Sequence, residues 1–205
     1  MTPSLKDLLK PHLSVIFCGI NPGLKSALDG HHFSNRSNRF WRVLHQAGFT
    51  PYQIDAVNDA SILDFGYGLT TAVERATVRA DELDKKEFAD SMQAFEKKIR
   101  FYQPEWIAFL GKPAYQAFSG KRNVTWGPQA ETFGGAKVWV LPNPSGLNRS
   151  FRLDDLVREY SKLLGFVAGY IKFDGYILDH YALRKNKPSE SFIKIDAFID
   201  DSTIN

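Results

Sequence analysis

The sequence predicts a three-layer α/β/α fold, in which helices cover both faces of a short, mainly parallel central sheet. Three short runs at residues 14–18, 106–110 and 137–141 are rich in β-branched and aromatic residues, and we expect them to be strands. These runs are apolar rather than alternating, which is typical of strands buried on both faces. Helical patterns alternate with them along the chain, and this order favours parallel strands joined by helical crossovers.

Capping residues and helical periodicity predict the other elements in order. At the N-terminus, Ser4 can cap a short helix with Leu5, Leu8 and Leu9 on one face, which Pro11 then ends. Further along, Gly48 ends the next helix and Pro104 ends a long amphipathic one. The remaining expected elements are helices over 38–47, part of 51–64, 81–101, 113–118 and 153–164, and a short strand over 69–73.

The composition is that of a globular protein and excludes several classes. Of the 205 residues, 43% are hydrophobic and 24% are charged. No apolar run approaches the about 20 residues of a membrane span, and the N-terminus lacks the pattern of a signal peptide. A single cysteine excludes an internal disulfide and a cysteine-based zinc site. We therefore expect a cytoplasmic protein with no membrane contact.

Two segments with different patterns are expected. Residues 1–164 hold all the predicted sheet and helices and form one domain, whereas residues 165–205 show no long helical stripe. This C-terminal extension is too apolar for a free linker, so we expect it to pack on the domain. The net charge of +3 is by itself weak evidence for a nucleic-acid partner.

A loop that contains Asn21 follows the first predicted strand. In a parallel sheet, such a loop lies at the carboxyl edge, where ligands bind. The neighbouring Pro22 and Gly23 favour a tight turn, in which the asparagine could bond its own backbone. Alternatively, its amide carbonyl could orient a water molecule, although an amide does not titrate and cannot serve as a general base.

The same loop contains one aromatic residue in a polar stretch. Phe33 could be a core anchor, or it could stack against a planar ligand such as a base. The pair His31-His32 stands without other ligands at metal-binding spacing, so no metal site is expected.

A second loop, "NPSGLNRSF", starts at Asn143 after the third predicted strand, so both loops should lie on one edge of the sheet. It could be an ordinary strand-to-helix connection with Ser150 as the helix cap. It could also hold Leu147 outward as a wedge that enters a base stack, with Arg149 beside it to meet phosphate.

Taken together, the two loops resemble those of the mismatch-specific uracil-DNA glycosylases, a bacterial branch of the uracil/thymine-DNA glycosylase superfamily. "VIFCGINPGLKSA" looks like the first motif of that family and "VLPNPSGLNR" like the second. "NRFWRVLHQAGFT", "TVRADEL" and "FLGKPAY" fall between them in the family's order, so the resemblance spans residues 4–164.

The resemblance implies a base-flipping enzyme and assigns roles to individual residues. Asn21 would position the water, Phe33 would stack on the flipped base, and backbone groups near Ile20 and Phe33 would bond the uracil edge. Asn143 would lie near a carbonyl of the base. The implied DNA contacts are Ser26, Gly146, Leu147, Asn148 and Arg149. Two positions depart from the pattern: Asn148 replaces a usual serine, and Thr71 replaces a lysine.

The function expected is that of a monofunctional glycosylase that removes uracil, and other modified bases such as etheno bases, from mismatched duplex DNA and leaves an abasic site. No cofactor is implied, the partner is double-stranded DNA with G·U or related mismatches, and we expect a monomer. The alternative is a non-catalytic protein that binds mismatched or damaged DNA with the same pocket and wedge. A nucleotide-binding protein with a flavodoxin-like topology is disfavoured because no phosphate-binding loop is present.

Overall fold

The structure is a computed structural model that describes residues 5–79, 82–168, 172–173, 176–178 and 192–194. Its contacts divide the chain into two compact units, Met1–Leu163 and Leu164–Asn205. The second unit contains a small antiparallel sheet in the order β6-β7-β8. Its strands are Lys172–Phe173, Tyr176–Leu178 and Phe192–Lys194. Most of residues 165–205 lie outside the described residues, so their packing on the domain stays a prediction.

The first unit is built on a five-stranded sheet in the order β2-β1-β3-β5-β4. Its first four members are parallel to one another, and β4 joins the edge of β5 in the antiparallel direction. The strands are β1 Val15–Gly19, β2 Tyr67–Thr71, β3 Trp106–Leu110, β4 Gly127–Phe133 and β5 Ala136–Leu141. Every residue of β1 and β3 is buried, which explains their continuous apolar sequences.

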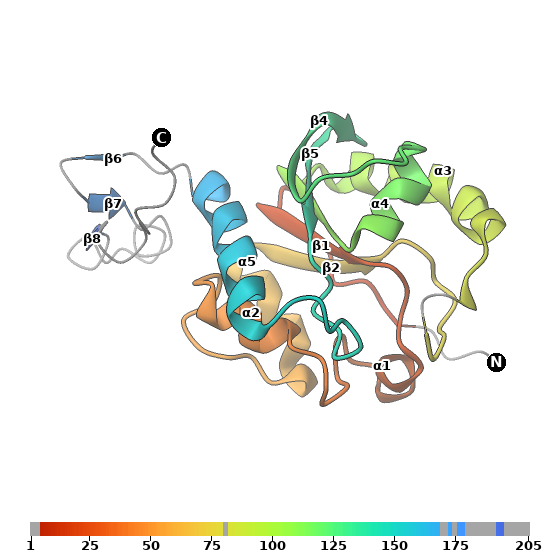
Figure 1. The fold of residues 1–205 in the computed structure, drawn as a ribbon, viewed down its shortest axis with the longest axis horizontal. Helices are drawn as coiled ribbons and strands as arrows, with labels where there is room; N and C mark the ends of the chain where they lie inside the picture. The colour runs from red at the N-terminus through yellow and green to blue at the C-terminus, as the bar shows by residue number, and fades with distance from the viewer. Residues whose placement is uncertain (1–4, 80–81, 169–171, 174–175, 179–191, 195–205) are drawn as a thin grey trace. The chain divides into compact units, whose positions relative to one another are not determined.

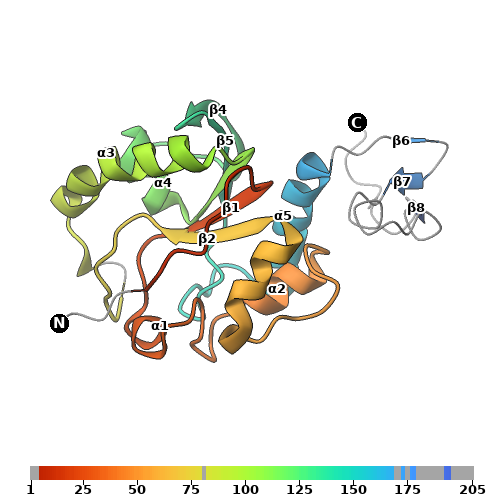
Figure 2. The same cartoon turned by 180° about the vertical axis from the view of Figure 1, so that it is seen from behind.

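Helices cover both faces of this sheet, as the three-layer prediction requires (Figures 1 and 2). Alternate residues of β1 point to opposite faces: Ile16 belongs to a cluster with residues of α3 and α4, whereas the Phe17 ring contacts Phe40 of α2 and Tyr160 of α5. The fold class is therefore confirmed. The helices are α1 Leu24–Asp29, α2 Phe40–Gln46, the 3-10 segment η1 Ala56–Phe65, α3 Lys85–Tyr102, α4 Lys112–Ser119 and α5 Leu153–Val167.

The N-terminal helix predicted over residues 5–9 is wrong. Leu8 instead forms an antiparallel bridge with Leu69, with both N–H···O distances at 2.9 Å. The reason is that β2 lies at the edge of the sheet, where its outward backbone groups need partners. Ser4, the predicted cap, lies outside the described residues. None of the helices in the described part of the chain is long and apolar enough to cross a membrane.

Candidate functional site

A cavity of about 650 Å³ opens at the carboxyl edge of the sheet. The ends of β1, β2 and β3 contribute Gly19, Thr71 and Leu110, and Asn143 follows the end of β5. Asn21 and Asn143 both line it, which confirms that the two loops lie on one edge. Parallel sheets bind ligands at this edge, close to where the strand order reverses, and here that point lies between β1 and β3.

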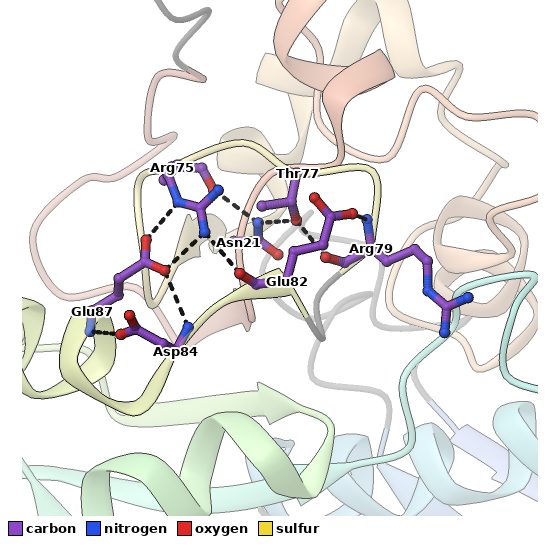
Figure 3. Close-up of polar contacts among 7 residues, drawn as sticks. All are labelled: Asn21, Arg75, Thr77, Arg79, Glu82, Asp84 and Glu87. Carbon is purple, nitrogen blue, oxygen red and sulfur yellow. Dashed lines mark hydrogen bonds and ion pairs between the residues drawn. The ribbon is translucent and has the colours of Figure 1, made fainter.

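The side-chain amide of Asn21 is held by residues far along the chain rather than by its own turn. Its Nδ2 donates to the carbonyl of Arg75 at 2.8 Å and to Oγ1 of Thr77 at 2.7 Å (Figure 3). A carbonyl can only accept, so the atom facing Arg75 must be the nitrogen. The hydroxyl of Thr77 donates its own hydrogen to the carbonyl of Arg79 at 2.8 Å, so it too can only accept from Asn21.

Both hydrogens of the Asn21 amide are therefore occupied. The side chain retains Oδ1, which accepts no hydrogen bond from any residue that the structure describes. An amide oxygen fixed in this way can accept a hydrogen bond from a water molecule but cannot remove its proton. The geometry thus supports a positioning role in preference to the turn-forming alternative.

Phe33 provides a flat aromatic wall in the cavity. Its ring stacks on that of Phe40, with centroids 3.9 Å apart and planes 22° from parallel. The backbone of Phe33 has φ 55°, a left-handed conformation that is unfavourable for a bulky residue. Hydrogen bonds to the preceding residue hold the strained backbone: His32 N donates to Asp59 Oδ2 at 2.7 Å, and Trp41 Nε1 donates to the His32 carbonyl at 3.1 Å.

His32 lines the cavity but is mostly enclosed, with 3% of its surface exposed. Its Nε2 lies 2.8 Å from the carbonyl of Lys6, and burial lowers the pKa of its imidazole below the ordinary value. The ring is therefore neutral at neutral pH and donates from Nε2. His31 faces Asp59, with Nδ1 and Oδ1 3.3 Å apart. No group of three or more metal-ligating side chains is found among the described residues.

Asn143, at the start of the second loop, uses its side-chain oxygen within the protein, whereas Asn21 uses its side-chain nitrogen. Its Oδ1 accepts from the backbone N–H of Ser145 at 2.9 Å, which is the local turn that Asn21 does not make. The Asn143 Nδ2 makes no hydrogen bond to a described residue and lies near Gly111 at the end of β3. The cavity is thus lined by an unused acceptor on Asn21 and an unused donor on Asn143.

Arg39 holds the second loop in place, and sequence reasoning assigned it no role. Its guanidinium donates to four carbonyls, at distances between 2.7 and 3.2 Å. Its backbone N–H donates to one of these carbonyls as well, at 3.0 Å. The four acceptors are the carbonyls of Pro144, Ser145, Asn148 and Phe151. The only sequence signal was its place in the "NRFW" run, which gives no hint of contacts more than a hundred residues away.

Comparison with known proteins places the chain in a family. Residues 6–165, well over half of the chain, match the sequence model of the family described as the uracil DNA glycosylase superfamily. The chain belongs to the uracil DNA glycosylase superfamily. Its fold is similar to the solution NMR structure of a candidate uracil DNA glycosylase from Methanosarcina acetivorans, with a TM-score of 0.59 and 19% identity over 81% of this chain and 98% of that one. Membership indicates a hydrolase that acts on N-glycosidic bonds in DNA and releases uracil.

In the glycosylase, the predicted wedge residue Leu147 follows Gly146, which lies in close contact with Ser37. A Cβ on Gly146 would lie 2.6 Å from the Ser37 carbonyl oxygen, so only glycine fits there. The next residue, Leu147, has 73% of its surface exposed and lines the cavity. Arg149 is also exposed. The alternative in which Ser150 caps a helix is wrong, because α5 begins at Leu153.

Three other predicted site residues of the glycosylase make contacts within the protein. Ser26 lines the cavity but is only 6% exposed, and its Oγ accepts from Ser34 N at 3.3 Å. The carbonyl of Ile20 accepts from Val73 N at 3.0 Å. The amide of Asn148 donates to the Asn143 carbonyl at 2.8 Å. Their roles toward DNA or the base stay predictions.

Proposed function

We propose that this member of the superfamily is a monofunctional, mismatch-specific glycosylase that flips uracil out of G·U pairs and hydrolyses its glycosidic bond. The observation that carries the proposal is the amide of Asn21, whose nitrogen is fully engaged and whose oxygen remains as an acceptor at the cavity. The chain would act as a monomer on double-stranded DNA, in the cytoplasm, and would leave an abasic site.

The reaction needs only positioning and electrostatic stabilisation. As the bond to uracil breaks, the sugar becomes oxocarbenium-like and the base leaves as an anion, which hydrogen-bond donors such as Asn143 Nδ2 stabilise. Water held by Asn21 Oδ1 then adds to the sugar carbon and loses its proton to solvent. Among the described residues that line the cavity there is no carboxylate. Without such a charge near the sugar cation, the enzyme should be slow and limited to bases that leave readily.

The product follows from the other residues that line the cavity. A glycosylase that also cleaves the strand requires an amine nucleophile to form a Schiff base with the sugar. The described lining contains no lysine, and Thr71 stands where the resemblance expects one. The described lining thus supports release of the base alone, with the DNA strand left intact.

Mismatch preference would come from the cost of flipping. A base in a G·U pair is extruded more easily than one in a standard pair, because less pairing energy is lost. Phe33 would then stack on the extruded base, a contact worth about 1–3 kcal/mol. Leu147 would fill the gap left in the helix, with Arg149 beside it.

The test is a panel of labelled oligonucleotides with G·U, A·U, single-stranded U, G·T and an etheno base. We expect the G·U strand to break only after alkali treatment, with the same yield in EDTA. Release of no base from any substrate, or breakage before alkali treatment, would contradict the proposal. A non-catalytic binder would instead give salt-dependent mismatch binding without base release.

A further inference from the structure

We propose that Glu87, on helix α3 and outside the cavity, is a positioning residue that fixes the amide of Asn21 through Arg75. For its effect on catalysis this inference rests on the proposed function. The chain of contacts runs from Glu87 to the guanidinium of Arg75, and from the carbonyl of Arg75 to Asn21 (Figure 3).

Arg75 is held by its side chain while its carbonyl holds Asn21. Its Nε and Nη2 donate to the two carboxylate oxygens of Glu87, at 2.5 and 2.8 Å, in a bidentate pair. Nη2 also donates to the carbonyl of Glu82 at 2.9 Å. Arg75 lies in neither a helix nor a strand, so these bonds restrict a backbone carbonyl that regular structure does not fix.

Glu87 is itself anchored at the start of an 18-residue helix. Its backbone N–H donates to Asp84 Oδ1 at 2.8 Å, and its Oε1 accepts from the backbone N–H of Asp84 at 3.1 Å, which together form a capping box. Hydrogen bonds from Arg75 lower the pKa of the Glu87 carboxyl to about 2, so the carboxylate is charged at any working pH. Glu87 is therefore held at the start of a helix, and its carboxylate stays negatively charged.

The two acceptors of the Asn21 amide are tethered independently. Thr77 is fixed by backbone bonds to the first loop, from Thr77 N to the Pro22 carbonyl at 3.1 Å and from Leu24 N to the Thr77 carbonyl at 2.8 Å. The side chain of Arg75 depends on Glu87 for two of its three hydrogen bonds to described residues. Loss of the ion pair would leave Asn21 with one reliable acceptor, and its amide could rotate so that nitrogen replaces oxygen at the cavity. A partial loss of rate is expected rather than a complete one.

The experiment compares Glu87→Ala with Asp84→Ala under single-turnover conditions on a G·U duplex. Glu87→Ala should slow base release about tenfold, because the water is misplaced, while the Kd for DNA changes by less than about twofold. Asp84→Ala removes only the bond from the Glu87 N–H to Asp84 Oδ1. It keeps the bond from the backbone N–H of Asp84 to Glu87 Oε1 and both Arg75–Glu87 contacts, so its rate should stay within about twofold of wild type. Glu87→Gln, which can keep the capping box and one contact with Arg75, should fall between the two.

A double variant tests whether Arg75 and Glu87 act in one path. If they do, the rate of base release by Arg75→Ala/Glu87→Ala should lie within about twofold of the rate of the slower single variant. Equal rates for Glu87→Ala and Asp84→Ala, or multiplicative losses in the double variant, would overturn the inference.

A second measurement does not depend on activity. The side-chain amide protons of Asn21, assigned by their loss in Asn21→Asp, should exchange with solvent about tenfold faster in Glu87→Ala than in wild type or Asp84→Ala. Unchanged exchange would overturn the inference even if rates fell. If wild type released no base, the proposed function would fail while this measurement would still decide the role of Glu87.

Discussion

Replacing Arg39 by alanine tests whether one side chain fixes the loop that holds Leu147 outward. The guanidinium donates to four carbonyls of residues 144–151, at 2.7 to 3.2 Å. Alanine removes all four donors at once and leaves the carbonyls of a strand-to-helix connection to be satisfied by water. The loop should become mobile while the sheet beneath it stays intact.

The size of the effect follows from the number of bonds. A hydrogen bond that involves a charged group contributes about 1.5–3 kcal/mol to stability. Because Arg39 is half-buried and its acceptors can recover water, we take about 1 kcal/mol for each, or about 4 kcal/mol in all. Lysine has a single nitrogen and reaches fewer carbonyls, so Arg39→Lys should lose about half as much.

The assay is urea unfolding followed by tryptophan fluorescence, with Arg42→Ala as the control. Arg42 lies in α2, the helix that Arg39 precedes as its N-cap residue, but Arg42 is exposed. Its replacement should change the free energy of unfolding by less than about 0.5 kcal/mol. Arg39→Ala should also slow single-turnover base release. A loss of less than about 1 kcal/mol together with a normal rate would refute the assignment of Arg39 as the residue that fixes the loop.

Three further predictions concern the walls of the cavity and its mouth. Phe33→Ala should lower the second-order rate constant of base release by about 5- to 150-fold, because a stacking contact worth about 1–3 kcal/mol is lost. Phe101→Ala, at an exposed position on α3, should leave this rate constant unchanged, and single-turnover rates at subsaturating enzyme measure both variants. Gly146→Ala should slow base release because its Cβ would meet Ser37 at 2.6 Å, and an unchanged rate would show that the two loops can separate freely. His32→Gln keeps a donor near the Lys6 carbonyl but does not titrate. Burial lowers the pKa of His32, so as the pH falls the unfolded chain takes up the extra proton before the folded protein does. Wild type should therefore lose stability relative to this variant as the pH falls below the ordinary pKa of 6.5. A difference in urea midpoint between the two proteins that stays constant from about pH 5 to 8 would contradict this.

The parallel core of the fold could be predicted because its strands are buried on both faces. β1 and β3 read as continuous apolar runs for that reason. The edge strand β4 was missed since most of its residues are partly or fully exposed, and its sequence GPQAETF carries no strong strand signal. The leucines of residues 5–9 were spaced like a helix, but the need of β2 for a partner decided their conformation.

The cavity residues with distinctive chemistry could be predicted, whereas the residues that orient them could not. Asn21, Phe33 and Asn143 stand out at strand ends and in a polar loop, and all three line the cavity. Arg75 reaches Asn21 across 54 positions, and Arg39 reaches the second loop across more than 100. No local sequence pattern predicts contacts between residues so far apart in the chain, because these contacts depend on how the strands are ordered in the sheet.

The most direct test of the account is the single-turnover rate of uracil release by Asn21→Ala on a G·U duplex with saturating enzyme. If the amide oxygen of Asn21 holds the attacking water, the rate should fall at least about 100-fold while the Kd for DNA stays close to that of wild type. A variant that releases uracil as fast as wild type would show that the water is positioned by another group, and the proposed mechanism would be wrong.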